Sequence, residues 1–328
     1  MSIQRTMFLL AAILASWPVF AATPQPVQRD YPAKPIRVVV PYAAGGPMDF
    51  IGRMLGRKMV PALGQNMVVD NRPGAGGALG TDLVAKAPPD GYTILLTSSS
   101  HASLPVITKS LPYDAVKDFT PISLVVNSVG FLLVAHSGVP ARSVQEFVAS
   151  AKAQPGKYNY GSGGVGNVMH FAAEIFNVMA GTKITHVPYK GVGQAVTDLV
   201  SGRIEVCFGP GTVLVPHVKS GKLKALGITA SHRWSELPDV PTIDEAGVKG
   251  YVFVPFYGLW FPAGTPDRYV ARVQSEVAKA MEDTEIKRAF ADQGFVPVAS
   301  TSAEFTKIIL GEIETNKRLA ARIGLTPE

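Results

Sequence analysis

The sequence predicts an α/β protein of two lobes, in which each lobe is a mainly parallel β-sheet flanked by helices. Apolar, strand-like runs alternate with segments of helical spacing along most of the chain, which is typical of parallel sheets covered on both faces. A glycine-rich turn follows a predicted strand in each half, at residues 43–46 and 161–166. The length of 328 residues also fits about two domains.

The composition is that of a chain that folds around its own core. Hydrophobic residues make up 47% and charged residues 17%, which is typical of globular proteins. The net charge of +6 is modest and the basic residues are scattered, so we expect no nucleic-acid partner. The six histidines lie far apart and form no His-Glu-x-x-His pattern, so we expect neither a metal site nor a cofactor.

The N-terminus has the pattern of a secretory leader. Arg5 precedes an apolar run at residues 7–16, and short side chains follow at residues 19–21. This pattern predicts a signal peptide, residues 1–21, that is cut after Ala21. The apolar run is shorter than the roughly 20 residues that span a membrane. The single cysteine, Cys207, lies in a strand-like run and is expected to be a buried, inert thiol.

The first half of the chain is predicted as alternating strands and helices. Residues 36–40 form a strand, and Ile51, Met54, Leu55 and Met59 then share one face of a helix. A strand follows at residues 67–69, and a third glycine-rich turn at residues 70–77 opens a helix through Ala87. The next strand covers residues 92–96. The apolar stretch 122–135 is expected to carry the chain into the second lobe.

The second half continues the same alternation. A helix at residues 143–153 begins with a capping box of Ser143 and Glu146. We predict strands at 158–160, 184–187, 204–208 and 223–229, and helices at 168–180, 192–200, 267–281 and 303–321. The apolar stretch 252–261 is expected to carry the chain back. The first lobe is therefore predicted as residues 28–122 plus 250–328, around a second lobe of residues 123–249.

The two glycine-rich turns predict an anion site between the lobes. Glycine lets the backbone approach a ligand closely, and the free N–H groups of a helix start attract anions. Pro47 removes one such donor, so the first turn is expected to bind through the amides of Met48 and Asp49 or through ordered water. An ion pair of Asp49 with Arg53, four residues on, is the alternative that we favour for its side chain.

Further polar residues are expected at the same site. Ser98, Ser99 and His101 follow a predicted strand, and ligands of parallel sheets bind at the carboxyl ends of strands. In the second turn, Ser162 is interpreted as a hydroxyl donor. His170, one turn into the next helix, either borders the ligand or lies on a polar face.

Two catalytic alternatives receive less support. Residues 161–166 match the Gly-x-Gly-x-x-Gly pattern of dinucleotide sites, but no acidic residue follows about 20 positions later to hold a ribose. A serine hydrolase using Ser162 is the runner-up function. It would need a small residue where Tyr160 stands, and the spacing does not select among Asp198, Asp239, His217 and His232 as partners of the serine.

Several segments together resemble one family. They are residues 31–36, 41–49, 71–77, 89–93, 161–174, 186–191, 237–247 and 262–266. From about Tyr31 to the C-terminus the chain resembles the substrate-binding receptors of tripartite tricarboxylate transporters, the Bug family. The resemblance implies a two-lobed periplasmic binding protein of the Venus-flytrap kind, similar to type II. It also implies a small organic carboxylate as ligand and membrane permease subunits as partners. We expect no catalysis and a monomer.

The resemblance also implies which residues bind the ligand. The first-loop contacts carry over to Tyr42, Ala44, Gly46 and Asp49, and the opposite loop's contacts to Ser162, Gly163, Gly166, Asn167 and His170. Relatives commonly carry an acidic residue after the strand that ends here at Phe208, where this chain has Gly209 and Pro210. Keto or hydroxy acids are therefore expected to bind better than amino acids. A receptor that serves a signalling partner instead of a permease stays an alternative.

Overall fold

Two β-sheets with their helices make up residues 31–323, the part of the chain that the computed structural model describes. The predicted signal peptide lies outside the described residues. Within them, the first sheet has six strands in the order β11-β4-β10-β3-β1-β2. Its strands are β1 (Ile36–Val40), β2 (Met67–Asn71), β3 (Thr93–Ser98), β4 (Phe119–Ser128), β10 (Phe256–Pro262) and β11 (Phe295–Pro297). Its helices are α1 (Pro47–Leu63), η1 (Ala75–Gly77), α2 (Ala78–Ala85), α3 (Ser100–Ile107), α8 (Asp267–Glu282), α9 (Thr284–Ala291) and α10 (Ser302–Ile323).

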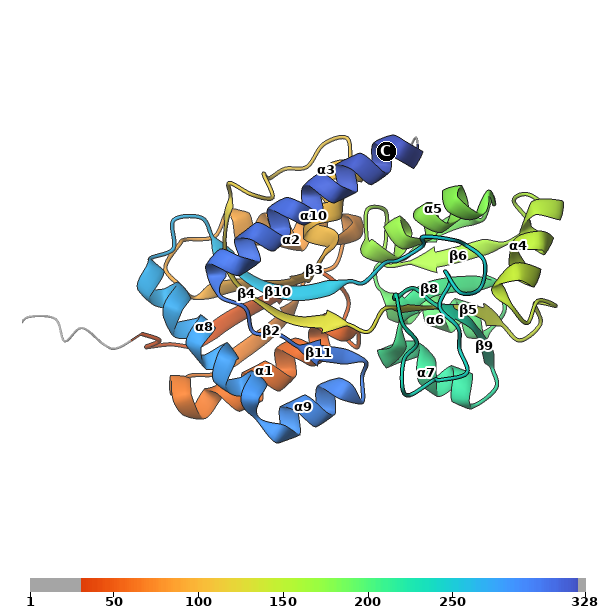
Figure 1. Ribbon diagram of the computed structural model, residues 1–328. Helices are drawn as coiled ribbons and strands as arrows, with labels where there is room; N and C mark the ends of the chain where they lie inside the picture. The colour runs from red at the N-terminus through yellow and green to blue at the C-terminus, as the bar shows by residue number, and fades with distance from the viewer. Residues whose placement is uncertain (1–30, 324–328) are drawn as a thin grey trace, which may run out of the picture. The chain divides into compact units, whose positions relative to one another are not determined.

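Helices cover both faces of this sheet. Successive residues of a strand point to opposite faces, so they pack into two different hydrophobic cores. In β1, Val38 and Val40 pack with α1, α8 and α9, whereas Val39 packs with α2 and α10. Figure 1 shows α2 and α10 on one side of the strands and α1 and α9 on the other. The predicted apolar face of α1 is buried in the first of these cores.

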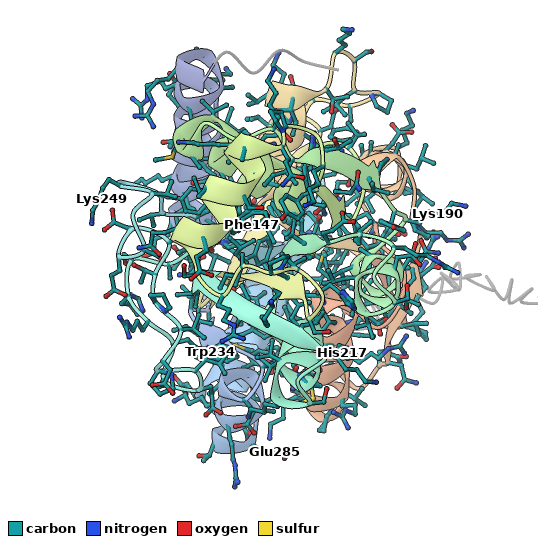
Figure 2. All side chains as sticks on the ribbon, turned by 90° about the vertical axis from the view of Figure 1, so that its right-hand side faces the viewer. Phe147, Lys190, His217, Trp234, Lys249 and Glu285 are labelled. Carbon is teal, nitrogen blue, oxygen red and sulfur yellow. The ribbon has the colours of Figure 1, made fainter. Side chains whose placement is uncertain are left out.

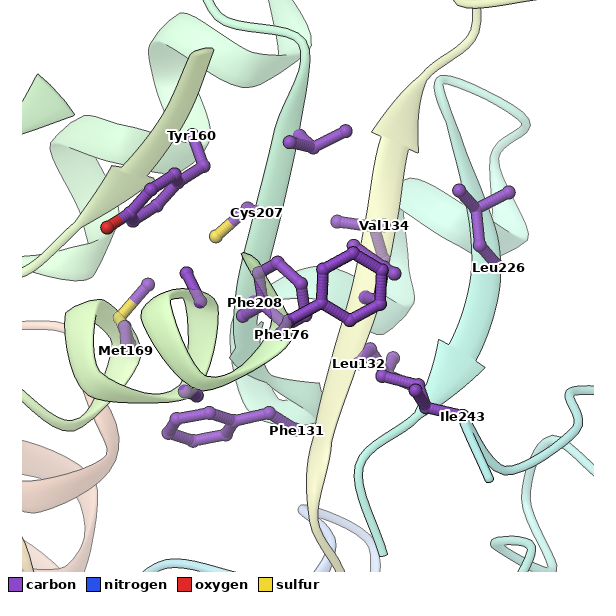
Figure 3. Close-up of a cluster of buried hydrophobic side chains, with 14 of the residues drawn as sticks. Phe131, Leu132, Val134, Tyr160, Met169, Phe176, Cys207, Phe208, Leu226 and Ile243 are labelled. Atoms are coloured by element: carbon purple, nitrogen blue, oxygen red, sulfur yellow. The ribbon is translucent and has the colours of Figure 1, made fainter. Parts of the chain in front are cut away.

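The second sheet, green in Figure 1, has five described strands in the order β7-β6-β8-β5-β9. They are β5 (Phe131–His136), β6 (Asn159–Ser162), β7 (Thr185–Pro188), β8 (Val206–Pro210) and β9 (Leu223–Ile228). The helices that accompany them are α4 (Val144–Ala153), α5 (Val168–Ala180), α6 (Val192–Val200) and α7 (Gly211–Lys219). Cys207 lies among the apolar side chains of this core, and its burial raises the pKa of the thiol to about 12 (Figure 3). The expected buried thiol is therefore confirmed.

Both sheets are mixed, although most of their strands share one direction. Strands β1, β2 and β3 are parallel, and β10 runs antiparallel to both β3 and β4. In the second sheet β6, β7 and β8 are parallel, and β5 is antiparallel to β8 and β9. The carboxyl ends of β1, β3, β6 and β8 can therefore contribute loops to one site. The predicted α/β fold class is confirmed.

The chain passes between the sheets twice. Strand β4 ends at Ser128 and β5 begins at Phe131, so the stretch predicted as one long strand is two strands in different sheets. Gly130 between them has a φ of +111°, which favours glycine. The chain returns between β9 and β10, so the first sheet takes strands from both ends of the described chain. The lobe boundaries at residues 122–123 and 249–250 stay a prediction.

Four elements have no counterpart in the sequence prediction: α3, α7, α9 and β11. Helix α3 contains Pro105 and a serine-rich start, and neither feature favours a helix. Strand β11 has only three residues, too few to show a periodicity. Among the described residues, no helix has the length and apolarity to cross a membrane.

Candidate functional site

A small cavity of about 30 Å³ lies between the two sheets, at the ends of their parallel strands. Tyr42 follows β1, Ser98 ends β3, Gly163 follows β6 and Pro210 ends β8. The other lining residues come from the adjoining segments: Ala43, Gly46, Pro47, Met48, Phe131, Asn167, Val168, Met169, Val192 and Tyr257. Ligands of α/β sheets bind at these strand ends, so this cavity is the candidate ligand site.

Four helices begin at this cavity. Gly46, Asn167 and Pro210 are the N-caps of α1, α5 and α7, and Val192 is the first residue of α6. The N-terminal end of a helix carries unpaired N–H groups and a partial positive charge. Among the described residues that line the cavity, none has a charged side chain. The helix starts therefore set the electrostatics of the cavity and favour an anion.

The first glycine-rich loop contributes three of its predicted residues to the lining: Tyr42, Gly46 and Met48. The Tyr42 hydroxyl donates a hydrogen bond to the carbonyl oxygen of Gly76 at 2.7 Å, and burial raises the pKa of this tyrosine. Ala44 is not among the lining residues. The predicted residues of this loop that line the cavity are therefore a glycine, a methionine and a neutral tyrosine, and none of them is charged.

Asp49 faces a different space. Its carboxylate accepts hydrogen bonds from Arg53 at 2.9 and 3.0 Å and from the Gly45 amide at 3.2 Å. Burial would raise the pKa of Asp49, but these hydrogen bonds outweigh it and hold the pKa below the ordinary value. Both side chains line an open groove of about 840 Å³ along α1 and β2. The ion pair with Arg53 that the sequence favoured for Asp49 is present. The groove is larger than the cavity between the sheets, but its lining residues come only from the first sheet, its helix α1 and the adjoining turns.

In the second glycine-rich loop, Gly163 and Asn167 line the cavity. The Asn167 side-chain oxygen accepts a hydrogen bond from the Met169 amide at 2.9 Å and so caps α5. Gly166 and His170 lie behind the lining, where the Gly166 amide donates to His170 Nδ1 at 3.2 Å. His170 is buried and is not among the lining residues, and whether it borders a bound ligand stays a prediction.

Ser162 is also buried behind the lining, next to a histidine that the sequence analysis did not select. Its Oγ lies 2.6 Å from Nε2 of His186, whose ring stacks on His170 at a centroid distance of 4.1 Å. Burial, and then the neighbouring His170, lower the pKa of His186 to about 3, so the ring is neutral. The pairing of Tyr160 with His186 across β6 and β7 creates this neighbourhood. No sequence spacing encodes that pairing.

The contacts of Ser162 fit a supporting group better than a nucleophile. Its hydroxyl donates to the carbonyl of Gly164 at 3.1 Å and accepts from the Gly164 amide at 3.0 Å. These two bonds tie the hydroxyl to the backbone of its own turn, and the 2.6 Å contact with Nε2 of His186 takes its direction from the tautomer of that ring. The serine therefore holds the turn that presents Gly163. The two histidines considered from the sequence lie elsewhere: His217, labelled in Figure 2, belongs to α7, and His232 has its Nδ1 3.3 Å from the Ser231 hydroxyl.

The serines that follow β3 divide between the cavity and the protein interior. Ser98 lines the cavity, and its Oγ lies 2.9 Å from that of Ser100, which accepts a hydrogen bond from the Val168 amide at 3.1 Å. Ser99 is buried away from the lining. His101 packs against Trp260 with its Nε2 2.7 Å from the carbonyl of Ala115, and burial lowers its pKa to about 4. Of this segment, only Ser98 reaches the site.

The apolar part of the lining was missed by the sequence analysis. Phe131, Met169, Val192 and Tyr257 come from four segments that share no motif, and apolar residues in strands and helices look like core. Gly209 is not a lining residue, but its neighbour Pro210 is. Among the described residues, no three His, Cys, Asp or Glu side chains lie close enough together to hold a metal ion.

Comparison with known proteins gives consistent matches. The family described as the tripartite tricarboxylate transporter family receptor matches residues 51–325. BugT of Bordetella pertussis is 36% identical over 309 residues, covering 93% of this chain and 94% of BugT. The solved periplasmic binding protein BugD has a TM-score of 0.87 at 30% identity, covering 91% of this chain and 100% of BugD. MatC from Rhodopseudomonas palustris, solved with bound malate, has a TM-score of 0.84 at 32% identity, covering 88% of this chain and 99% of MatC.

These matches span the same two sheets whose strand ends surround the cavity. The relatives are solute-binding proteins, and one of them holds a dicarboxylate. The resemblance stated from the sequence motifs is confirmed over nearly the whole described chain. This chain therefore belongs to the tripartite tricarboxylate transporter receptor family, which includes the Bug proteins.

Proposed function

We propose that this protein captures a small organic carboxylate between its two sheets, where their strand ends surround the cavity, and delivers it to the membrane permease subunits of a tripartite transporter. The described cavity of about 30 Å³ is smaller than such a ligand, so the strand ends move apart to admit it. One observation carries the proposal. A cavity without charged side chains receives the N-terminal ends of four helices, and such ends attract anions. The malate bound by the related MatC supports the same ligand class.

Neutral donors hold the carboxylate in this proposal. Met48, Ser98 and Asn167 line the cavity and can supply a backbone amide, a hydroxyl and a side-chain amide. Hydrogen bonds to a charged group contribute about 1.5–3 kcal/mol each, so a few of them suffice for tight binding. Phe131 and Met169 lie on the apolar part of the wall and contact the carbon chain of the ligand.

The same lining disfavours amino acids. An ammonium group needs a carboxylate partner, and the described lining residues include none. Asp49, the nearest acidic residue of the first loop in sequence, is paired with Arg53 and faces the outer groove. Hydroxy and keto acids are therefore the preferred ligands.

A thermal-shift screen with matched pairs tests this function. The panel contains malate, its amino counterpart aspartate and its diamide, together with other mono- and dicarboxylates, sugars and polyamines. A ligand at about 100 times its Kd adds roughly 2.7 kcal/mol of stability. At about 2–4 °C per kcal/mol, the melting temperature should rise by several degrees with at least one acid. The diamide should have no effect, and aspartate should shift less than malate.

A shift with a sugar or a polyamine, and with no acid, would overturn the carboxylate function. The bond between Ser162 and His186 keeps one alternative open to measurement, which is a serine hydrolase. Hydrolysis of p-nitrophenyl acetate that is lost in Ser162→Ala would favour it. We expect no hydrolysis from either protein, because the serine hydroxyl supports its own turn.

We further propose that residues 1–21 direct the chain to the periplasm, where it acts as a monomer of two lobes, residues 28–122 plus 250–328 and 123–249. The relatives are periplasmic binding proteins, which supports this location. Mass spectrometry of the exported protein should find an N-terminus at Ala22. Deletion of the gene should abolish uptake of the acid identified in the screen, whereas a purely sensory receptor would leave uptake intact.

A further inference from the structure

The third glycine-rich turn lies outside the cavity lining, yet its backbone touches the ligand loop of the second sheet. A Cβ atom on Gly76 would overlap the carbonyl oxygen of Val165 and lie 2.9 Å from the carbonyl carbon. From the other side, a Cβ on Gly164 would lie 3.0 Å from Cα of Gly76. The two backbones therefore meet without any side chain between them, and only glycine permits this approach.

This turn is held in an unusual backbone conformation. Four successive residues have positive φ angles: Gly74 at +147°, Ala75 at +46°, Gly76 at +61° and Gly77 at +105°. Ala75 carries a Cβ and is disfavoured at such an angle. Strained backbone of this kind persists where surrounding contacts hold it, and it occurs often at ligand clamps.

Tyr42 connects this turn to the cavity. Tyr42 is one of the residues that line the cavity, and its hydroxyl donates to the carbonyl oxygen of Gly76 at 2.7 Å. A Cβ on Gly77 would lie 2.7 Å from the same hydroxyl, so the turn lies directly against the tyrosine. One side chain thus contacts both the ligand space and the backbone that meets Val165.

The contact lies beside both the cavity lining and an open groove. An open groove of about 480 Å³ lies on its outer side, lined by Gly74, Gly76, Val165 and Lys190, the last labelled at the edge of the molecule in Figure 2. Gly163 lines the cavity and the next residue, Gly164, lines the groove. Opening the contact between Gly76 and Val165 would therefore open the cavity at this point.

We propose that residues 74–77 form a latch that holds the closed form of the protein, and that Tyr42 couples the latch to the bound ligand. The proposal rests on the carboxylate-binding function. A ligand that contacts both sheets binds only the closed form. Its apparent Kd is the intrinsic Kd divided by the fraction of protein that is closed, so a variant that closes less often binds more weakly. Gly76 is in this sense a positioning residue, which sets ligand affinity without touching the ligand.

The test compares Gly76→Ala with Gly64→Ala. Both glycines have similar positive φ angles, +61° and +68°, but a Cβ on Gly64 meets nothing within 4 Å. The probe is malate, or, if malate gives no shift, the panel acid with the largest shift. By calorimetry and stopped-flow, Gly76→Ala should weaken binding about tenfold or more, chiefly through faster dissociation, and Gly64→Ala should stay within about twofold of wild type. At one fixed ligand concentration, a few times the wild-type Kd, X-ray scattering should show compaction of wild type and Gly64→Ala and much less compaction of Gly76→Ala.

Equal binding and compaction in the two variants would overturn the latch and leave the carboxylate function standing. If no acid of the panel binds the wild type, the carboxylate-binding function is overturned, and so is the latch proposal that rests on it. If Gly76→Ala does not fold, Gly164→Ala replaces it. Its control is then Gly247→Ala, because Gly164 and Gly247 have φ angles of +119° and +100°, and a Cβ on Gly247 has no neighbour closer than 3.7 Å.

A double-mutant cycle tests the coupling. Tyr42→Phe keeps the ring in the cavity and removes the hydroxyl that holds Gly76. It should weaken binding severalfold in wild type and have little effect in the Gly76→Ala background, because the contact it supports is already lost. An equal loss in both backgrounds would show that the hydroxyl acts on the ligand or through its other partners, Ser100 and Asn167, and it would overturn the coupling.

Discussion

His101 and His186 are histidines whose pKa values burial lowers strongly, to about 4 and about 3. Both rings are therefore neutral near pH 7. His186 supports the second ligand loop through Ser162, and His101 packs against Trp260 in the interior. Neither histidine contributes a positive charge, so in the proposed site an anion is bound by the backbone N–H groups of the helix starts.

The buried His101 should make stability depend on pH. In the unfolded chain the pKa of His101 returns to about 6.5. Between about pH 6.5 and pH 4 the unfolded state therefore binds a proton at this residue and the folded state does not. The stabilising effect is complete above about pH 7 and is lost as the pH falls from 6.5 toward 4. His101 alone should cost about 2 kcal/mol between pH 7 and pH 5, measured by urea unfolding.

The control for this prediction is a second histidine variant. His101→Gln keeps a donor for the carbonyl of Ala115 but does not titrate, so its unfolding free energy should vary less between pH 7 and 5 than that of wild type. His232→Gln changes an exposed histidine and should keep the wild-type pH dependence. If His101→Gln retains the full dependence, His101 is not responsible for it.

Single residues also show the limit of sequence motifs. The sequence identified the glycine loops correctly, because glycine at a strand-to-helix turn has a local physical reason. It could not show that Ser162 turns away from the cavity toward His186, which stands 24 positions later. It likewise gave no sign that His101 points into the interior while Ser98, three residues earlier, lines the site.

At the scale of elements, the helix starts have two different functions. Ser143 caps α4 by accepting from the Glu146 amide at 3.2 Å, far from the cavity lining. Asn167 caps α5 in the same manner, but it also lines the cavity. One cap is therefore only structural, and the other belongs to the proposed site.

Alanine at these two caps should separate stability from binding. Loss of an N-cap costs about 1 kcal/mol, so Ser143→Ala and Asn167→Ala should both lower the free energy of unfolding by a similar amount. Ser143→Ala should leave the Kd for the identified acid within about twofold, whereas Asn167→Ala should raise it about tenfold. Urea unfolding and calorimetry measure the two effects. Wild-type affinity of Asn167→Ala would remove Asn167 from the site.

Elements with a strong local signal were the predictable ones. The capping box of α4 and the apolar face of α1 appear in the structure as predicted. Helix α3 and strand β11 were not predictable, because Pro105 and a three-residue length hide any periodicity. Contacts with the rest of the fold hold both in place, as the pairing of β11 with β4 shows.

For the molecule as a whole, Cys207 offers a measure of opening. It is the only cysteine of the chain, and it is fully buried in β8 beneath the ligand loops. Ellman's reagent should therefore label the native protein only through transient unfolding, and label it rapidly in urea. A ligand at about 100 times its Kd should slow labelling roughly a hundredfold, provided that opening is fast relative to labelling. Rapid labelling of the native, ligand-bound protein would contradict this.

The sequence by itself determined the alternation of strands and helices, the glycine loops and the family, because each rests on residues close together in the chain. Only the tertiary structure decided which loops meet. Strand pairing sets Tyr160 beside His186, and the return of the chain through β10 adds Tyr257 to the cavity. Gly76 meets Val165 although the two residues lie far apart in the sequence and belong to segments that follow strands of different sheets. Such contacts depend on the order and register of strands that lie far apart in the sequence. The local periodicity of hydrophobic residues depends on neither.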